Sequence, residues 1–497
     1  MLRDALRKIF SFPIILALII FIFVFLGTGS SVGDPDLWWH LRNAEYFFTH
    51  LTTPQVDLYS YTTNGHPWMN HEWLAEIPYY LAWRVGGLMG IYVLSVGLVC
   101  FIMLGIYYWA YNQSRNLKAS FLVTCFSMFL AVVSFGPRTI LFGYIYLLIL
   151  LLLLARYRAT GQAPLWVIPP LFCVWINTHG SWLLGLIVFS IYLVAGLVEG
   201  SWGRVEAVRW APAQRQRLLI TLGASIGALL VNPFTDRLVA YPFDLAFRQK
   251  LNIAHIAEWA SVNFNEARGI VVLVLLGAVF LSALFSRYRW KLEELLLASF
   301  ALYAGLKHVR FLILAAILLA PLLAKMLDMI PPYKPEIDKP LLNAVIMACL
   351  LYFVVGRIPS SGDLDKAVSK GYPVAAVTFI KSHGLSGNVF NRYMWGGYLI
   401  FFCRDVKTFI DGRTDIFEYT GVLKDYVDAE VIKNSLEILD KYHIRYVLIP
   451  PDYPLAYLLK NNVGWKVIFA DDVTTIFERA APPPAPSAAA LPAGSAH

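Results

Sequence analysis

Charged residues are scarce in this chain. Only 15% of its 497 residues are Asp, Glu, Lys or Arg, whereas 58% are hydrophobic, and the mean hydropathy is +0.58. A single soluble core could not bury that much apolar surface. The composition therefore excludes an ordinary soluble protein and predicts a polytopic membrane protein.

Several sequence features of soluble enzymes are also missing. The five cysteines show neither the spacing of a metal site nor that of a disulfide framework, which argues against redox chemistry. The sequence contains no internal repeat, no P-loop and no dinucleotide-binding fingerprint. ATP and NAD are therefore not expected as cofactors.

Apolar runs recur along the chain. Runs of about 17 to 25 apolar residues match the length needed to cross roughly 30 Å of hydrocarbon. The first run lacks a small-residue cleavage site, so we interpret it as an anchor and not as a signal peptide. We count eleven candidate spans, several of them short, at residues 9–27, 88–111, 119–135, 140–155, 165–176, 182–197, 218–231, 270–285, 295–305, 311–327 and 341–355.

Basic residues alternate between the predicted loops. Lys and Arg accumulate in short cytoplasmic loops, and here they precede the first span and then fall in every second loop, for example at Arg115 and between Arg204 and Arg217. This pattern predicts a cytoplasmic N-terminus and, with eleven spans, an extracytoplasmic C-terminal region, as in a bacterial inner-membrane protein. The net charge of +8 largely reflects this bias, so no nucleic-acid partner is expected.

The composition changes after the last span. Residues 372–384, 446–453 and 465–479 have patterns typical of a helix, a strand and a strand. They predict a small extracytoplasmic α/β domain over residues 357–480, followed by a disordered Pro/Ala tail at 481–497. Residues 1–356 would form the helical transmembrane domain, with a large first external loop at 28–87.

Residues able to do chemistry gather in the predicted external loops. The first of these loops opens with "GDPDLWWHLR", and two others are the short turns "FGPRTILFG" and "GLKHVRF". Each candidate has a plain alternative, because arginine snorkels and histidine or tryptophan favours interfaces regardless of function. The candidates in these loops are Asp34, Asp36, His40, Arg42, His66, His71, Glu72, Arg138, His179, Glu258, Lys307, His308 and Arg310.

Four motifs resemble a known family. "DLWWHLR" resembles the Asp-Pro-aromatic-aromatic-His/Asn-x-Arg motif of the catalytic subunit of oligosaccharyltransferases, members of the GT-C superfamily of membrane glycosyltransferases. "HIAEWASVNF", "KHVRFLILAAILLAP" and "RYMWGGYLI" are similar, in the same order, to the family's glutamate loop, a late span and the motif that opens its outer domain. The resemblance implies a GT-C-like fold and transfer of a sugar from a polyprenyl-linked donor to an extracytoplasmic glycan, lipid or protein.

Such a reaction needs a base and a cation at the membrane edge. Asp36 is the predicted catalytic base, placed at the start of a helix that begins "LWWHLRNAEYFF", with Asp34 as a second carboxylate. A guanidinium suits the leaving phosphate because its N–H groups match the geometry of phosphate oxygens. The predicted donor-phosphate residues are Arg310, Lys307, His308 and Arg138.

The chain also departs from the oligosaccharyltransferase pattern. A divalent cation, Mg²⁺ or Mn²⁺, is a candidate cofactor at Asp34 and Asp36, helped by first-loop histidines. However, the second external loop lacks the acidic metal ligands of that family, and the acceptor motif has lost its acid in "WGGY". These losses favour a transferase of single sugars from a polyprenyl-phosphate donor over transfer of an oligosaccharide from a pyrophosphate-linked donor.

The outer domain offers candidates for acceptor binding. These are Trp395 and Tyr398 in the first motif of the domain, and Asp411 and Arg413 in "FIDGRTDIFEY". The alternative for the second pair is structural: a turn after a strand, with Arg413 paired to a carboxylate.

Two non-enzymatic functions stay open. A transporter of lipid-linked saccharides should carry ionisable residues in the middle of its spans, whereas here they cluster at one predicted face. A scaffold that only displays the outer domain would have no need of Asp34 and Asp36.

Overall fold

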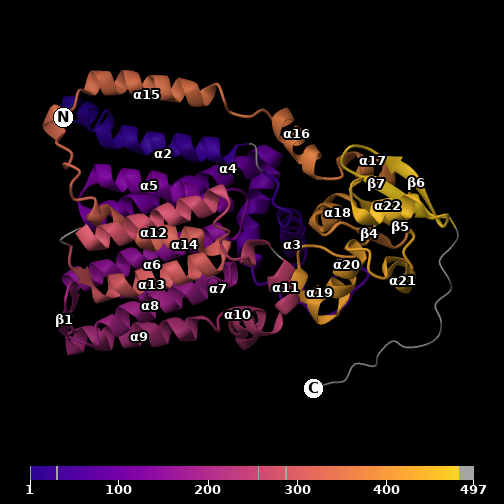
Figure 1. Cartoon of the computed structure of the whole chain (residues 1–497), viewed down its shortest axis with the longest axis horizontal. Helices are drawn as coiled ribbons and strands as arrows, with labels where there is room; N and C mark the ends of the chain where they lie inside the picture. The colour runs from indigo at the N-terminus through magenta and orange to yellow at the C-terminus, as the bar shows by residue number, and fades with distance from the viewer. Residues whose placement is uncertain (1, 30–31, 256, 286–287, 481–497) are drawn as a thin grey trace. The chain divides into compact units, whose positions relative to one another are not determined.

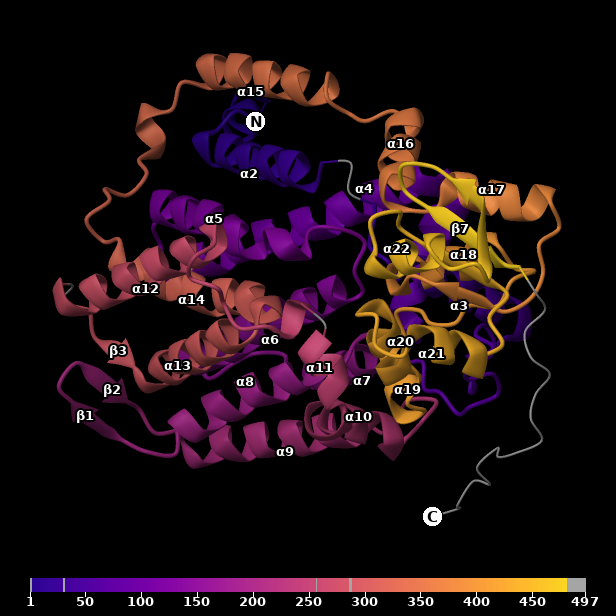
Figure 2. The same ribbon diagram turned by 45° about the vertical axis from the view of Figure 1, so that its right-hand side comes forward.

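The computed structural model describes residues 2–29, 32–255, 257–285 and 288–480. The chain folds into two compact units, whose elements are labelled in Figures 1 and 2. The helical unit consists of Met1–Asp34 and Met69–Ala367, and the α/β unit consists of Pro35–Trp68 and Val368–His497.

The helical unit is a bundle of mostly apolar helices (Figure 1). Helix α14 (Leu312–Met326) is buried along nearly its whole length and packs against α4 (Trp73–Ser114), α5 (Leu117–Ala131) and α13 (Leu292–Lys307). Helix α16 (Ser361–Gly371) leads from this unit into the next. The other helices of the unit are α1 (Leu2–Ile9), α2 (Phe12–Thr28), α6 (Ile140–Thr160), α7 (Ile168–Thr178), α8 (Trp182–Ala195), α9 (Pro212–Ala228), α10 (Asp236–Arg248), α11 (Lys250–His255), α12 (Ala267–Phe285) and α15 (Pro340–Val355).

Each predicted span overlaps a helix, but the count of eleven membrane spans was wrong. Among the described residues, three helices are long and apolar enough to cross a membrane: Trp73–Ser114, Ile140–Thr160 and Val309–Met326. Six other apolar helices have only 10–17 residues, fewer than the roughly 20 residues that the hydrocarbon layer requires. Apolar periodicity identified the helices, but it does not separate a helix that spans the membrane from a short helix buried in a bundle.

The long helix α4 contains a kink. Gly87 has φ 54° and ψ −136°, a conformation that glycine adopts without the steric cost of a Cβ. The predicted span at 88–111 begins directly after this residue, so the kink separates the apolar part of α4 from its aromatic first part. A short sheet that the sequence did not predict, with strands β1 (Gly200–Trp202), β2 (Val205–Ala207) and β3 (Trp290–Lys291), completes the unit.

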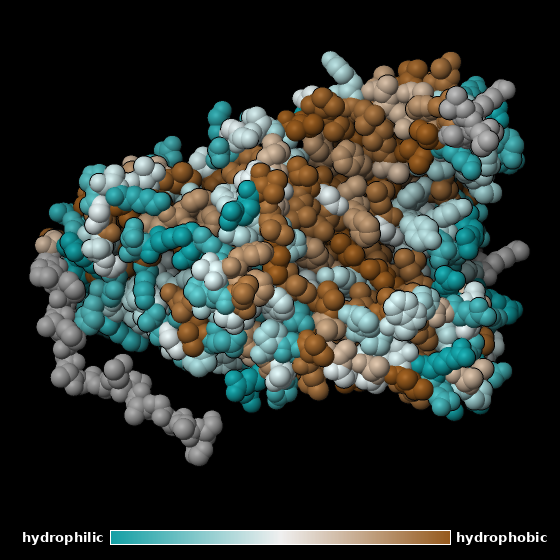
Figure 3. Space-filling view, turned by 180° about the vertical axis from the view of Figure 1, so that it is seen from behind, coloured by the Kyte–Doolittle hydropathy of each residue, from teal (hydrophilic) through white to brown (hydrophobic). Residues whose placement is uncertain are grey.

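Hydrophobic side chains are also exposed on the helical unit. Phe101, Phe129 and Phe280, on α4, α5 and α12, are 59%, 64% and 63% exposed. Figure 3 shows a broad hydrophobic surface on one face of the chain. Large exposed apolar areas are typical of a surface that contacts lipid or a partner, in keeping with a membrane protein.

The α/β unit is built on a four-stranded sheet with the strand order β4-β5-β7-β6. Strands β4 and β5 are parallel, and the other two pairs are antiparallel. The strands are β4 (Val389–Asn391), β5 (Tyr446–Ile449), β6 (Trp465–Ala470) and β7 (Thr475–Arg479). The helices of the unit are α3 (Leu37–His50), α17 (Val374–Ser382), α18 (Gly396–Phe402), α19 (Thr414–Tyr419), α20 (Val422–Glu430), α21 (Ser435–Lys441) and α22 (Pro454–Lys460).

The predicted elements of this domain are confirmed in part. Helix α17 and strand β5 lie where the sequence predicted them, whereas 465–479 forms two strands, β6 and β7, with a turn at Asp471. The strand expected before Asp411 is not formed; Thr408 makes only isolated bridges, to Val389 and to Ser60. The tail at 481–497 lies outside the described residues.

The first predicted external loop, residues 28–87, is divided between the two units. Its residues Pro35–Trp68 belong to the α/β unit, where α3 packs against α18. Trp38 is 1% exposed, and its ring lies 5.2 Å from those of Tyr398 and Phe402. This division differs from the sequence boundary near residue 357 because Trp38 and Trp39 of α3 are buried in the core of the α/β unit.

Candidate active site

Two carboxylates share one arginine in the helical unit. Arg138 Nε lies 3.0 Å from Asp34 Oδ2, and Arg138 Nη1 contacts Glu258 Oε1. The three residues come from distant segments: the chain after α2, the turn before α6 and the 3₁₀ turn at Ala257–Trp259. The Asp34 side chain is only 11% exposed, so its ion pair is partly shielded from water. We call these three residues the carboxylate bridge.

Arg310 lies near the bridge but is paired differently. Its guanidinium stacks on the ring of Trp259, 4.3 Å from the ring centroid, which is a favourable cation–π distance. Its Nε is buried without a hydrogen-bond partner, and in the described part of the chain no carboxylate forms an ion pair with Arg310. Arg310 is half-buried, and a cation partly removed from water without a counter-charge is costly unless a ligand supplies one.

Tyr144 links Arg310 to the bridge. Its hydroxyl donates a hydrogen bond to the Arg310 carbonyl at 3.3 Å, and the charges of Arg310, Arg138 and Glu258 all act on it. Of the other predicted phosphate residues, His308 donates from Nδ1 to the Trp259 carbonyl at 2.6 Å, depending on its tautomer. This bond fixes the indole that carries the guanidinium.

Lys307 has a different environment. Its Nζ is exposed and donates to the Tyr303 hydroxyl at 3.2 Å, at the end of α13. Its predicted role at the donor phosphate stays a prediction.

A second polar cluster lies where α4 begins and α7 ends. His179 Nδ1 accepts the Ser181 backbone N–H at 2.9 Å, so the proton of a neutral His179 is on Nε2, 3.3 Å from Glu72 Oε1. His71 Nε2 lies 3.6 Å from the same oxygen, and its ring stacks on Tyr241 at 4.4 Å. The sequence singled out His71 and Glu72 as neighbours and His179 separately; the structure brings all three together.

The arrangement of these side chains does not fit a metal centre. Across the residues that the structure describes, no group of three or more His, Cys, Asp or Glu side chains is placed to hold a metal ion. Between Asp34 and Glu258, the positive charge comes from the Arg138 guanidinium. His66, which the sequence offered as a possible ligand, is exposed and contacts the Pro67 carbonyl through Nδ1.

Asp36 belongs to the α/β unit. It is the N-cap residue of α3, which confirms the predicted start of that helix, and its Oδ1 accepts the Trp39 Nε1–H at 2.9 Å. A Cβ on Gly412 would lie 1.7 Å from the same oxygen. Only glycine therefore lets the turn at 411–413 approach Asp36 this closely.

The nearby residues His40 and Arg42 have structural contacts. His40 is 4% exposed, and its ring lies 3.7 Å from that of Trp39. Arg42 pairs with Glu45, which Arg404 also contacts at 2.8 Å. The contacts of His40 and Arg42 lie within α3, and the Glu45–Arg404 ion pair joins this helix to the segment after α18.

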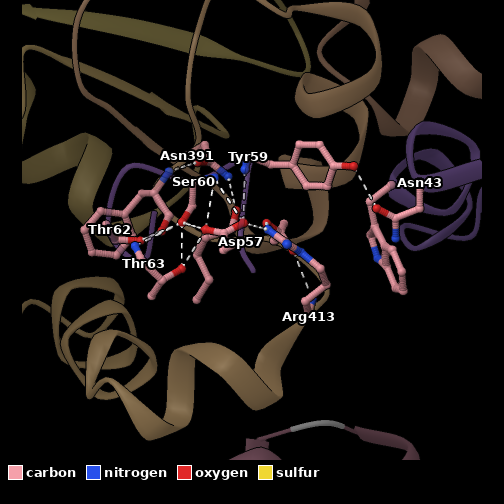
Figure 4. A network of polar contacts seen from close by, with 12 residues as sticks. Asn43, Asp57, Tyr59, Ser60, Thr62, Thr63, Asn391 and Arg413 are labelled. Carbon is pink, nitrogen blue, oxygen red and sulfur yellow. Dashed lines mark hydrogen bonds and ion pairs between the residues drawn. The ribbon is translucent and has the colours of Figure 1, made fainter. Parts of the chain in front are cut away.

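Arg413 is buried between two carboxylates in this unit. Its Nη2 lies 2.7 Å from Asp57 Oδ1 and 2.7 Å from Asp411 Oδ2, and all three side chains are at most 1% exposed. The rings of Tyr59 and Trp68 lie 5.0 and 4.9 Å from the guanidinium carbon. The paired arginine that the sequence offered as the structural alternative is therefore confirmed, and Asp57, which the sequence did not single out, is the second partner (Figure 4).

The network keeps Asp57 and Arg413 charged. Burial tends to raise the pKa of Asp57, but the charge of Arg413 and hydrogen bonds from Ser60, Tyr59 and Thr63 outweigh it and hold that pKa below its ordinary value. Burial likewise tends to lower the pKa of Arg413, and the two aspartates hold it above its ordinary value. The ion triad therefore joins residues 57 and 411–413 within one unit.

The substitution Thr63→Val tests this network. Thr63 Oγ1 donates to Asp57 Oδ2 at 2.8 Å, and loss of a hydrogen bond to a buried charge costs about 1.5 to 3 kcal/mol. The melting temperature of the purified chain in detergent should therefore fall. The exposed Thr378, which bonds the Val374 carbonyl of its own helix, provides the matched control Thr378→Val; equal melting temperatures for the two variants would contradict the prediction.

The same substitution should change how the stability of the folded chain falls at acidic pH. The folded pKa of Asp57 lies below its unfolded value of about 3.9, so its contribution is complete above that pH and is lost as the pH falls through the folded pKa. Thr63→Val removes one of the bonds that lower the folded pKa. The acid-induced loss should accordingly begin at the same pH but be smaller in the variant, so the gap in melting temperature between the variant and the unmodified chain should shrink as thermal unfolding is measured at decreasing pH.

The two aromatic acceptor candidates are core residues of the α/β unit. Trp395 is fully buried and donates from Nε1 to the Gly371 carbonyl at 2.8 Å. Tyr398 stacks on Tyr372 with 5.2 Å between ring centroids. Acceptor binding by Trp395, Tyr398, Asp411 and Arg413 stays a prediction.

Comparisons with known proteins bear on the fold. No family model and no curated protein matches the sequence. Among solved structures, the chain is similar to the oligosaccharyltransferase of Archaeoglobus fulgidus in the apo form, with a TM-score of 0.52 and 12% sequence identity over 88% of this chain and 69% of that chain. The likeness shows that the chain has the fold of this class of membrane protein, in agreement with the fold implied by "DLWWHLR".

Proposed function

We propose that the protein is a membrane glycosyltransferase that transfers a sugar from a polyprenyl-phosphate donor to an extracytoplasmic acceptor. The observation that carries the proposal is the contrast between two arginines of the helical unit. Arg138 is neutralised by Asp34 and Glu258, whereas Arg310 is held by an aromatic face and forms no ion pair with a carboxylate among the described residues. A phosphate group would supply the missing counter-charge.

The chemistry of transfer assigns roles to these residues. The bond between the anomeric carbon and the donor phosphate oxygen breaks while the oxygen of the acceptor hydroxyl bonds to the same carbon. Arg310 donates N–H groups to the phosphate and stabilises the negative charge that develops on it. The proton of the acceptor passes to Asp34, which Arg138 orients, and Glu258 helps to hold the acceptor.

This proposal assigns the role of catalytic base to Asp34 in place of Asp36. The sequence alone ranked Asp36 first as the base. The ion pairs of the helical unit place Asp34 beside Arg138 and Glu258, in the same unit as Arg310. Asp36 then has a positioning role, because its carboxylate binds Trp39 at the start of α3.

The test is a direct transfer assay. The purified chain in detergent is incubated with radiolabelled sugars on polyprenyl phosphate or on polyprenyl pyrophosphate, together with an extract of glycans, lipids and proteins. We expect label to move from the monophosphate donor. Transfer from the pyrophosphate donor alone would instead support an oligosaccharyltransferase-like reaction. Movement of the intact donor across the membrane of vesicles into which the chain has been reconstituted, without transfer, would support a transporter.

A chelator should leave transfer unchanged. Arg138 supplies the positive charge between Asp34 and Glu258, so the proposed reaction has no step that needs a divalent ion. The measurement is the rate of sugar transfer with and without EDTA. Loss of transfer in EDTA, restored by Mg²⁺ or Mn²⁺, would contradict this prediction and would support the metal site suggested by the resemblance.

A further inference from the structure

The helical unit contains a pocket of about 630 Å³. It is lined by the end of α6, the turns that follow, the beginning of α7 and the middle of α9. Arg138 precedes α6 and the pocket residue Arg156 lies near its end, so about 27 Å of helix separates the two. The pocket is therefore distinct from the candidate active site.

Two arginines give the pocket a positive charge. Arg156 and Arg217 both line it, and in the described parts of the chain neither forms an ion pair with a carboxylate. Tyr157, which follows Arg156 in the lining, donates from its hydroxyl to the Gln214 carbonyl of α9 at 3.3 Å. This bond joins α6, which carries Arg156, to α9, which carries Arg217.

Beyond the arginines the pocket becomes apolar. Arg217, Ile220 and Ala224 line it from α9, at spacings of three and seven residues that share one helix face. Ile220 is 63% exposed and Trp166, which lines the pocket from the turn before α7, is 76% exposed. A cation followed within about 10 Å by an exposed apolar stripe and a tryptophan is the arrangement expected where a helix passes from headgroups into acyl chains.

We propose that this pocket binds an anionic phospholipid of the surrounding membrane. The phosphate lies between Arg156 and Arg217, and the acyl chains run along Ile220 and Ala224. Charge complementarity selects the occupant, because a zwitterionic lipid brings its own cation and an arginine near an anionic headgroup is stabilised by it. The volume of the pocket is in the range that holds a headgroup-sized ligand.

Native mass spectrometry of the full chain tests the proposal. The chain is delipidated in detergent and titrated with phosphatidylglycerol or phosphatidylcholine. The double variant Arg156→Ala with Arg217→Ala should bind phosphatidylglycerol about tenfold more weakly, while phosphatidylcholine binding stays unchanged. The matched control is Arg215→Ala, on the same helix and outside the pocket lining; it should bind phosphatidylglycerol as the unmodified chain does.

A cross-linking experiment locates the bound lipid on the chain. A photoactivatable phosphatidylglycerol should cross-link to the peptide 161–169, and Arg156→Lys with Arg217→Lys should retain most of the binding. Equal losses in the double alanine variant and in Arg215→Ala would show a general charge effect and overturn the proposal. Displacement of the lipid by inorganic phosphate, or preferential capture of polyprenyl phosphate, would also overturn it by identifying a different occupant.

Discussion

Asp34→Asn is expected to lower the turnover of sugar transfer by about 10³-fold, in the middle of the range of about 10² to 10⁴-fold for loss of a general base. Asparagine keeps the shape of the side chain but cannot accept the proton of the acceptor, and it removes one of the two charges on Arg138. The protein should still fold, because Glu258 continues to neutralise Arg138. The measurement is the initial rate of transfer from the radiolabelled monophosphate donor.

Asp36→Asn is the control variant for this prediction. The amide oxygen of asparagine can still accept the Trp39 Nε1–H that Asp36 accepts at 2.9 Å, so a positioning role should survive largely intact. A much smaller loss is therefore expected than for Asp34→Asn. Full activity in Asp34→Asn together with no activity in Asp36→Asn would restore the order that the sequence alone suggested.

The fold could be anticipated further than the site. Apolar runs located the helices of the membrane unit, since burial in a bundle and burial in lipid require the same side chains. For the same reason these runs could not give the number of spans. The tryptophans of α3 show a similar ambiguity: amphipathic aromatic residues suit a membrane interface and a protein core equally, and only tertiary packing places Trp38 against Tyr398.

The sequence identified the site residues individually, but it did not show which of them pair with one another. Asp34, Arg138 and Glu258 are separated by roughly a hundred residues each, and no local pattern records a pairing over that distance. Arg413 shows the opposite case. Its Asp-Gly-Arg context correctly indicated a paired arginine, but Asp57 sits in a polar loop segment with no feature that marks it as buried.

Arg310→Ala should lower turnover by about 10² to 10³-fold, the typical loss when one preorganised donor to a developing charge is removed. Arg310→Lys should recover only part of this loss, because an ammonium keeps the charge but cannot form two parallel hydrogen bonds to phosphate or stack as a plane on Trp259. If the charge develops mainly in the transition state, kcat should fall more than the KM for the donor rises.

The control for Arg310 is an arginine of the same unit with no place in the proposed chemistry. Arg248 is 78% exposed and pairs with Asp244 within α10, so Arg248→Ala should transfer sugar at the rate of the unmodified chain. Comparable losses in both variants would point to damaged folding or a general effect of charge. Unchanged turnover in a well-folded Arg310→Ala would remove the residue from the site and, with it, the observation on which the proposed donor class rests.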